Sequence, residues 1–293
     1  MGNFSLLLEV RSLSCNMNFP PSDLANNKQF NGSWAVILGG SSGFGLAALE
    51  KLATHGMNIA VLYRETSAPE KILKERLAAL ASSNNVTISE FNINALDPGA
   101  IALFGQEFAA LVGKKHSVKL LLHSVARGNL KSLIVPGSVD PDEILSVKDI
   151  QFTTYAMATS LLDWTRSLLA GEHFHPDARI IGLTSEGAHK YWEGYAAVSI
   201  AKSSLESLVT YMAVELSKYG LKTNLIKAGI TDTPSLKKLP SSDALIELAT
   251  GRNPLGRLTR PEDVANVIYL LCTDEASWIN GSIIHVDGGE HCR

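Results

Sequence analysis

From Ser33 onward, short apolar runs alternate with segments of helical length, and this alternation limits the folds open to the chain. The apolar runs are 33–38, 58–64, 86–93, 118–126, 178–185, 221–229 and 281–289. The segments with a helical pattern are 46–56, 69–82, 97–113, 147–170, 194–219 and 261–273. Strands that are apolar along their whole length are buried on both faces, as in a parallel sheet covered by helices. The sequence therefore predicts a single doubly wound α/β domain over 31–293, with a parallel seven-stranded sheet.

Residues 1–30 do not follow this alternation, and we expect an irregular N-terminal extension. Pro20-Pro21 and Asn26-Asn27 would interrupt regular structure there. The apolar stretch 4–10 is short and has no charged leader before it, so we expect no signal peptide.

Composition favours a cytoplasmic protein that binds neither nucleic acid nor membrane. The chain has 26 basic and 29 acidic residues, a net charge of −3, and so lacks the basic excess of a nucleic-acid-binding protein. No run of 18 apolar residues is present. Its three cysteines are widely spaced, which favours a reducing compartment over a disulfide framework.

The stretch GGSSGFG (39–45) lies directly between the first predicted strand and the first predicted helix. Glycines at such a turn let the backbone approach a pyrophosphate, and the helix N-terminus offers unpaired N–H groups to it. The turn indicates a Rossmann-type dinucleotide site. The residues expected to contact the cofactor are Gly39, Ser41, Ser42, Gly43, Phe44 and Gly45.

The end of the second strand bears on the choice of cofactor. An acidic residue usually binds the ribose 2′-hydroxyl of NAD at this place. Here the chain reads Arg64-Glu65, and Arg64 could pair with a 2′-phosphate through its planar guanidinium. We therefore expect NADPH rather than NADH. Glu65 argues against this choice, and a solvated Arg64 is the alternative.

Tyr195 and Lys202 stand seven positions apart near the start of a predicted helix. Seven residues turn through about 700°, so the two side chains lie within about 20° of each other on one face. The rise between them is about 10.5 Å, against about 6 Å for a four-residue spacing. Both spacings can direct two side chains at one cofactor, but the longer one moves the hydroxyl along the site.

Taken in order, these motifs resemble the short-chain dehydrogenase/reductase superfamily over roughly 31–290. HSVA (123–126), AGITDT (228–233) and the C-terminal stretches 253–271 and 280–289 add to the resemblance. Two details are similar to its enoyl-acyl-carrier-protein reductase type. HSVA stands where most members have Asn-Asn-Ala-Gly, and the pair is Tyr-x6-Lys where most have Tyr-x3-Lys.

The resemblance implies roles for the remaining site residues. Lys202 would bind the nicotinamide ribose, and Tyr195 would donate a hydrogen bond to a thioester oxygen. Ser185, which stands where the familiar enoyl reductase has a second tyrosine, would assist it; a structural serine is the alternative. Other cofactor contacts would be Asn92, Ile93, Ser124, Val125, Ala126, Gly229, Ile230, Thr231 and Thr233. Tyr191, Leu236 and Leu239 would contact the acyl chain.

The implied activity is NADPH-dependent reduction of the 2,3-double bond of an enoyl thioester, carried by CoA or an acyl carrier protein, in fatty-acid or polyketide-type biosynthesis. Two alternatives stay open. The chain could be a 3-ketoacyl or other carbonyl reductase, although Val198 replaces the tyrosine expected four residues before Lys202. It could also be a catalytically idle NADPH-binding partner. We expect no metal, because His173 and His175 have no further ligand at a suitable spacing.

The predicted helix 147–170 is apolar on more than one face. Such a helix needs cover on two sides, of which the sheet supplies one. The same helix of a second subunit would supply the other. We therefore expect a homo-oligomer, a dimer of dimers by resemblance.

Overall fold

A parallel sheet forms the centre of the molecule. A computed structural model describes residues 29–113, 115–138, 140, 142–239 and 242–293. The strand order is β3-β2-β1-β4-β5-β6-β7, with every pair parallel. The strands are β1 (Trp34–Leu38), β2 (Asn58–Tyr63), β3 (Ile88–Asn92), β4 (Val118–His123), β5 (Phe174–Thr184), β6 (Lys222–Ala228) and β7 (Ile283–Val286). The predicted single Rossmann-type domain with seven parallel strands is confirmed.

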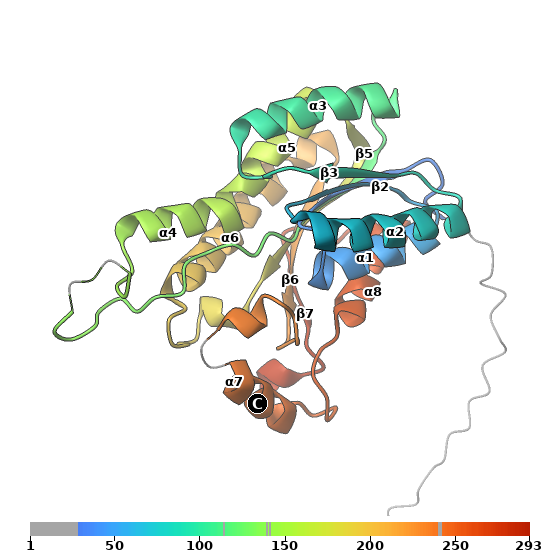
Figure 1. Ribbon diagram of the computed structural model, residues 1–293. Helices are drawn as coiled ribbons and strands as arrows, with labels where there is room; N and C mark the ends of the chain where they lie inside the picture. The colour runs from blue at the N-terminus through green and yellow to red at the C-terminus, as the bar shows by residue number, and fades with distance from the viewer. Residues whose placement is uncertain (1–28, 114, 139, 141, 240–241) are drawn as a thin grey trace, which may run out of the picture.

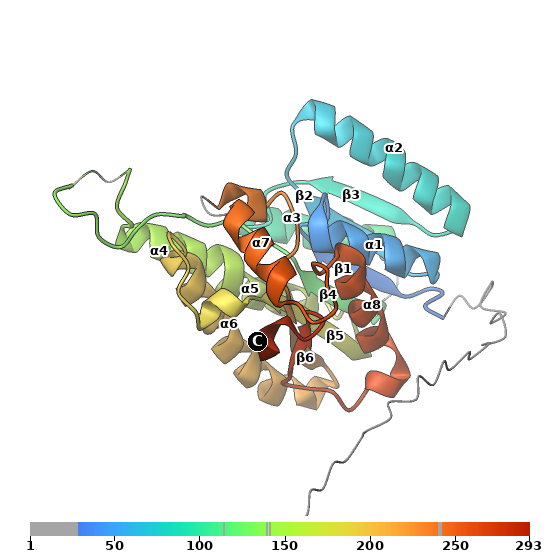
Figure 2. The same ribbon diagram turned by 90° about the horizontal axis from the view of Figure 1, so that it is seen from below.

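Helices cover both faces of this sheet (Figures 1 and 2). One face carries α1 (Gly43–Thr54), α2 (Ser67–Asn84) and α8 (Pro261–Cys272). The other carries α3 (Pro98–Val112), α5 (Ser160–Ala170) and α6 (Ala196–Glu215), and α4 (Val147–Thr154) packs beside α6. The last helix, α7 (Ser242–Arg252), lies apart from both layers, near the C-terminus. None of the helices described is long and apolar enough to cross a membrane.

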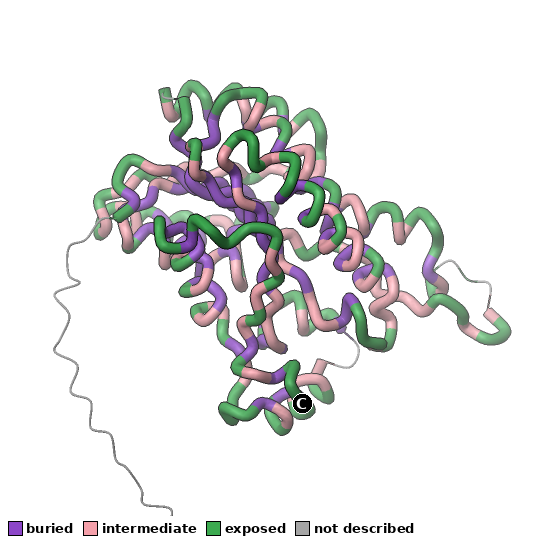
Figure 3. The backbone as a smooth tube through the Cα atoms, turned by 180° about the vertical axis from the view of Figure 1, so that it is seen from behind, coloured by how far each residue is buried: buried purple, intermediate pink, exposed green. Residues whose placement is uncertain are grey.

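The strands supply two hydrophobic cores in alternation. Ala35 and Ile37 of β1 pack into the core under α1 and α8, whereas Val36 and Leu38 pack into the core under α3, α5 and α6. Successive strand residues point to opposite faces, so burial on both faces requires apolar residues throughout. The buried strands at the centre of Figure 3 show this double burial.

Three elements differ from the sequence predictions. The predicted helix 147–170 is α4 and α5 joined by a π-helical turn, η1 (Tyr155–Thr159). β5 begins at Phe174 rather than at 178, so His175 lies in this strand. α7 was not predicted at all.

The N-terminal boundary also differs. Residues 1–28 of the predicted extension lie outside the described residues. Phe30, which the prediction placed in the extension, is buried and packs edge-to-face on Tyr269, with ring centroids 5.7 Å apart. The Tyr269 hydroxyl donates a hydrogen bond to Gln29 Oε1 at 2.8 Å. Gln29 and Phe30 therefore pack on the domain.

Candidate active site

A cleft of about 500 Å³ opens at the carboxyl end of the sheet. Ligands of open α/β sheets bind outside these strand ends, where the strand order reverses, here between β1 and β4. The predicted site residues that line this cleft are Gly39, Ser41, Ser42, Gly43, Phe44, Arg64, Ser124, Val125, Ala126, Ser185, Tyr195, Lys202, Gly229, Ile230, Thr231, Thr233, Leu236 and Leu239. Residues from six separate segments thus converge on one site.

The glycine loop is held against the neighbouring strand ends. The N–H of Gly39 donates to the carbonyl of Leu62 at 2.9 Å. Gly39 has φ +85°, and a Cβ there would lie 2.5 Å from the carbonyl oxygen of Ser124. A Cβ on Gly45 would lie 2.2 Å from the carbonyl oxygen of Gly39. Both positions therefore require glycine, and the loop brings the N-terminus of α1 to the cleft.

Tyr195 is the N-cap of α6 rather than a residue inside the helix. Its hydroxyl donates to Ser185 Oγ, which follows β5, at 3.4 Å. Gly187 lies under the Tyr195 ring, where a Cβ would come within 2.6 Å of Cε1. Burial raises the pKa of Tyr195, so the phenol stays protonated at neutral pH and can donate a hydrogen bond.

Lys202, in the second turn of α6, is buried with its ammonium at the cleft. Its Nζ donates to the carbonyl oxygen of Leu183 at 2.7 Å. Burial lowers the pKa of Lys202 to about 8. His123, at the end of β4, is also buried, and its Nε2 lies 2.9 Å from Ser160 Oγ. Desolvation lowers its pKa to about 3, so His123 is neutral and acts as a structural link to α5.

Four predicted residues lie outside the cleft lining. Tyr191 is 88% exposed, so its predicted acyl contact is not supported, and the neighbouring Trp192 lines the cleft instead. Gly45 is buried behind the glycine loop. Asn92 is the last residue of β3, and its side-chain amide makes two hydrogen bonds with the backbone of Glu65. Ile93 follows it and packs on the core.

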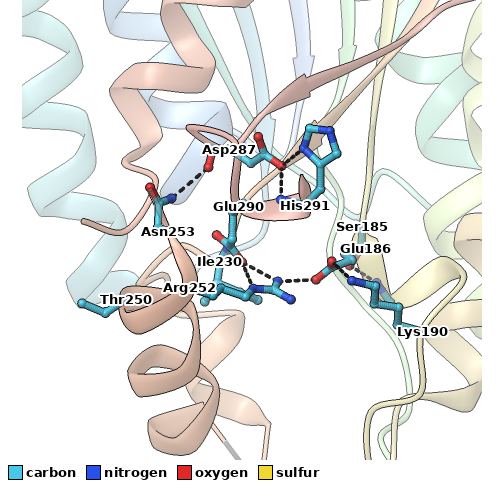
Figure 4. A network of polar contacts seen from close by, with 12 residues as sticks. Ser185, Glu186, Lys190, Ile230, Thr250, Arg252, Asn253, Asp287, Glu290 and His291 are labelled. Carbon is cyan, nitrogen blue, oxygen red and sulfur yellow. Dashed lines mark hydrogen bonds and ion pairs between the residues drawn. The ribbon is translucent and has the colours of Figure 1, made fainter. Parts of the chain in front are cut away.

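An ion-pair network among residues that line the cleft was not predicted (Figure 4). Arg252, the last residue of α7, pairs with Glu186 after β5 and with Glu290 near the C-terminus. Arg252 Nη2 is 2.6 Å from Oε1 of Glu290, which is only 1% exposed. Oε2 of Glu290 accepts the N–H of Ile230 at 3.2 Å. The network therefore connects α7 to the loop after β6. Its members lie far apart in the sequence, so no local sequence pattern predicts it.

The chain is similar in sequence and in fold to known proteins. The family model described as enoyl-(acyl carrier protein) reductase matches residues 39–291. An enoyl-(acyl-carrier-protein) reductase (NADH) FabI of Aquifex aeolicus (strain VF5) is 33% identical over 175 residues, which are 60% of this chain and 63% of that relative. One of Enterococcus faecalis is 27% identical over 241 residues, 82% of this chain and 89% of the relative. A crystal structure of the Aquifex aeolicus enzyme superposes with a TM-score of 0.75 at 24% identity, covering 90% of this chain and 98% of that one.

These relatives contradict the predicted NADPH cofactor, because both are named as NADH enzymes. The surroundings of Arg64 explain why this residue does not indicate NADPH. The Arg64 side chain is exposed, and Glu65 lines the same end of the cleft beside it. A carboxylate here offsets the positive charge that a 2′-phosphate needs.

The family match spans most of the described residues, and the glycine loop, Ser185, Tyr195 and Lys202 all meet in one cleft. The chain belongs to the enoyl-(acyl carrier protein) reductase family of the short-chain dehydrogenase/reductase superfamily, and is an oxidoreductase.

Proposed function

We propose that the protein reduces the 2,3-double bond of an enoyl thioester, with NADH as the hydride donor. One observation carries the proposal: Tyr195 and Lys202 face the same cleft, and the position four residues before Lys202 is the buried, apolar Val198. A carbonyl reductase needs its hydroxyl beside the carbon that receives hydride. In enoyl reduction, hydride adds to the β-carbon, whereas negative charge develops further along on the thioester oxygen. The displaced Tyr195 hydroxyl suits that second geometry.

The cleft fits a dinucleotide. Any side chain larger than hydrogen at Gly39 would collide with Ser124, so the loop leaves backbone open to a pyrophosphate. Ser42 is the N-cap of α1 and makes no capping hydrogen bond, which leaves its hydroxyl free to bind a phosphate oxygen. We propose that Glu65 holds the adenosine ribose hydroxyls. The bound NADH supplies the hydride.

The chain's own residues would then stabilise the developing charge. Tyr195, neutral and partly buried, would donate to the thioester oxygen as the enolate forms, which is electrostatic stabilisation by a preoriented donor. Lys202 would bind the nicotinamide ribose hydroxyls and add positive charge nearby. Ser185 Oγ, 3.4 Å from the Tyr195 hydroxyl, would orient that hydroxyl.

An apolar wall would bind the acyl chain. Large apolar residues on the cleft surface include Leu130, Met157, Trp192, Val198, Leu236 and Leu239. Met157 belongs to the π-helical turn η1, and such turns often occur at functional sites. We infer that the acyl group lies between η1 and the segment that contains Leu236 and Leu239. Lys237 and Lys238 are exposed beside it and would meet an acidic carrier protein. We place the reaction in the cytoplasm.

The reaction is tested by following NADH absorbance with paired substrates. We expect turnover of 2-enoyl thioesters, carried by CoA and by acyl carrier protein, and much slower turnover of 3-ketoacyl thioesters of the same length. Preference for the ketoacyl substrates would identify a carbonyl reductase. NADH binding without turnover of any thioester would identify an idle partner.

The cofactor assignment predicts a preference for NADH that depends on Glu65. Two like charges about 4–5 Å apart in a partly solvated site repel by about 1–3 kcal/mol, so NADH should exceed NADPH in kcat/KM by about 5- to 150-fold. Glu65→Gln should narrow that ratio, whereas Glu75→Gln on the exposed face of α2 should not. Steady-state kinetics with both cofactors would measure the ratio of kcat/KM for NADH to kcat/KM for NADPH in each protein. Equal or better use of NADPH by the unmodified enzyme would contradict the assignment.

Two exposed apolar side chains of α4 predict self-association. Val147 is 70% exposed and Phe152 is 38% exposed, although both are large and apolar. We propose that α4 pairs with its copy in a second subunit, as a two-fold contact allows. Light scattering at micromolar concentration should give a dimer or tetramer, and the double variant Val147→Asp, Phe152→Asp should give monomer. Ile72→Asp on α2, equally exposed, is the control and should leave the assembly intact. A monomeric unmodified protein would exclude the contact.

A further inference from the structure

The C-terminal segment brings together two histidines and an aspartate that have no part in the proposed reaction. His285 lies in β7, Asp287 follows it, and His291 lies in the 3-10 turn η6 (Glu290–Cys292). One ligand atom from each side chain lies within 4.8 Å of the other two. Asp287 Oδ2 is 2.6 Å from Nδ1 of His291 and 3.8 Å from Nδ1 of His285. The two imidazole rings face each other with centroids 3.9 Å apart.

We propose that His285, Asp287 and His291 form a binding site for a divalent transition-metal ion such as Zn²⁺. Two imidazole nitrogens and one carboxylate oxygen are a donor set that suits Zn²⁺ and its neighbours better than Mg²⁺ or Ca²⁺. Around a tetrahedral Zn²⁺ with bonds of about 2.1 Å, donor atoms are about 3.4 Å apart. The two distances from Asp287 Oδ2, 2.6 and 3.8 Å, lie on either side of that value. Changes of less than about 1 Å would bring both of these distances to that value.

Neighbouring groups already orient the ligands. Asp287 Oδ1 accepts the N–H of Gly289 at 3.0 Å, and its Oδ2 accepts the N–H of His291 at 3.1 Å. Asn253 Nδ2 donates to the Asp287 carbonyl at 2.9 Å. When Nδ1 of His291 binds an ion, its ring proton must lie on Nε2, which is 3.5 Å from Cys292 Sγ. Partners of this kind fix ligand orientation and strengthen metal binding.

The cluster is open to solvent on one side. The side chains of His285 and His291 are 36% and 39% exposed, whereas Asp287 is 7% exposed. Asp287 and His291 line both the main cleft and a second cleft of about 420 Å³, and His285 lines only the second. An ion would therefore sit on the side of the second cleft, with its remaining positions filled by water.

The ion would cross-link β7 to η6. Glu290, the first residue of η6, holds both Arg252 and the N–H of Ile230 at the main cleft (Figure 4). Metal binding would therefore stabilise the C-terminal wall of the main cleft without entering the reaction. Metal binding by these three residues does not depend on which substrate the main cleft accepts.

The chain offers a matched control for this cluster. His189 Nε2 lies 2.6 Å from Glu206 Oε2, which is the same kind of histidine–carboxylate pair without a second histidine. If one histidine–carboxylate pair were enough to bind the ion, both the His189–Glu206 pair and the C-terminal cluster would bind it. If a second histidine is needed, only the C-terminal cluster will bind it.

The test measures Zn²⁺ binding to untagged full-length protein by competition with a chromogenic chelator, and Co²⁺ binding by its visible absorption. We expect one ion per chain with micromolar or tighter affinity and an intense, tetrahedral-type Co²⁺ spectrum. His285→Ala and His291→Ala should each weaken binding by at least about tenfold. His189→Ala should not change it, and Cys292→Ser should retain the ion. Unchanged affinity in both cluster variants, or no stoichiometric binding by the unmodified protein, would overturn the site.

A second measurement needs no variant. Zn²⁺ should protect His285 and His291 from carbethoxylation by diethyl pyrocarbonate, read by peptide mass spectrometry, while His189 continues to react. Zn²⁺ should also raise the Tm, since a ligand that binds only the folded state stabilises it. Equal modification of all three histidines with and without Zn²⁺ would refute the proposal even if the variants failed to fold.

Discussion

Replacing Tyr195 with Phe is expected to lower kcat for enoyl reduction by about 10²–10³-fold while the affinity for NADH changes little. The change removes only the hydroxyl, and loss of one donor to a developing oxyanion has an effect of about this size. The ring would still pack against Trp192, whose centroid lies 5.0 Å away, and over Gly187. The fold should therefore be unaffected.

Stopped-flow and steady-state measurements with a 2-enoyl thioester, together with NADH titration by fluorescence, would test this. Tyr211→Phe is the matched control, since Tyr211 lies on the outer part of the same helix and is 66% exposed. Ser185→Ala should have a smaller effect, because Ser185 acts on the substrate only through Tyr195. Full activity in the Tyr195 variant would refute the role given to this hydroxyl.

The order of strands and helices could be predicted because the signals are local. A strand buried on both faces shows as an unbroken apolar run, and β1 with Trp34–Leu38 is fully buried as expected. α7 was missed because Ser242–Arg252 does not cover the sheet and buries only Ala249, so it has no apolar stripe. The π-helical turn η1 was missed because its residues suit an ordinary α-helix equally well.

The meeting of residues in one cleft could be predicted where those residues lie at one strand end or along one helix. The glycine loop, Ser185, Tyr195 and Lys202 are of this kind. Contacts between distant segments were not predictable. Arg252 and Glu290 are 38 residues apart, and only the tertiary fold makes them a pair.

Two predictions depended on a choice between neighbouring residues that compete for one role. Arg64 and Glu65 both stand at the end of β2, and the sequence alone does not show that the arginine side chain is exposed. Tyr191 and Trp192 are likewise adjacent aromatic residues, of which only Trp192 reaches the cleft. The direction of a side chain in a loop has no sequence period to reveal it.

Replacing Lys202 with Met should weaken NADH binding by about 10–100-fold and lower kcat as well. A hydrogen bond from a charged group contributes about 1.5–3 kcal/mol, and the ammonium is the charged donor proposed for the ribose hydroxyls. Lys218→Met, just beyond the far end of α6, is the control for loss of a lysine outside the cleft. Unchanged NADH affinity in the Lys202 variant would contradict this assignment.

The pH dependence separates this role of Lys202 from a structural one. Burial lowers the pKa of Lys202 to about 8, from an ordinary value near 10.5. In the free enzyme the ammonium therefore loses its proton as pH rises through about 8, and kcat/KM for NADH should fall there.

Between about pH 8 and 10.5 the unfolded chain binds more protons than the folded one, so this group makes the free energy of unfolding rise with pH. Below that window the buried charge costs on the order of 3 kcal/mol. The Met variant removes that cost, although the Leu183 carbonyl loses its donor. It should therefore lose the kinetic inflection near pH 8 while its free energy of unfolding at pH 7 is not reduced. A marked loss of stability with the inflection retained would show that Lys202 serves the fold and that another group binds the cofactor.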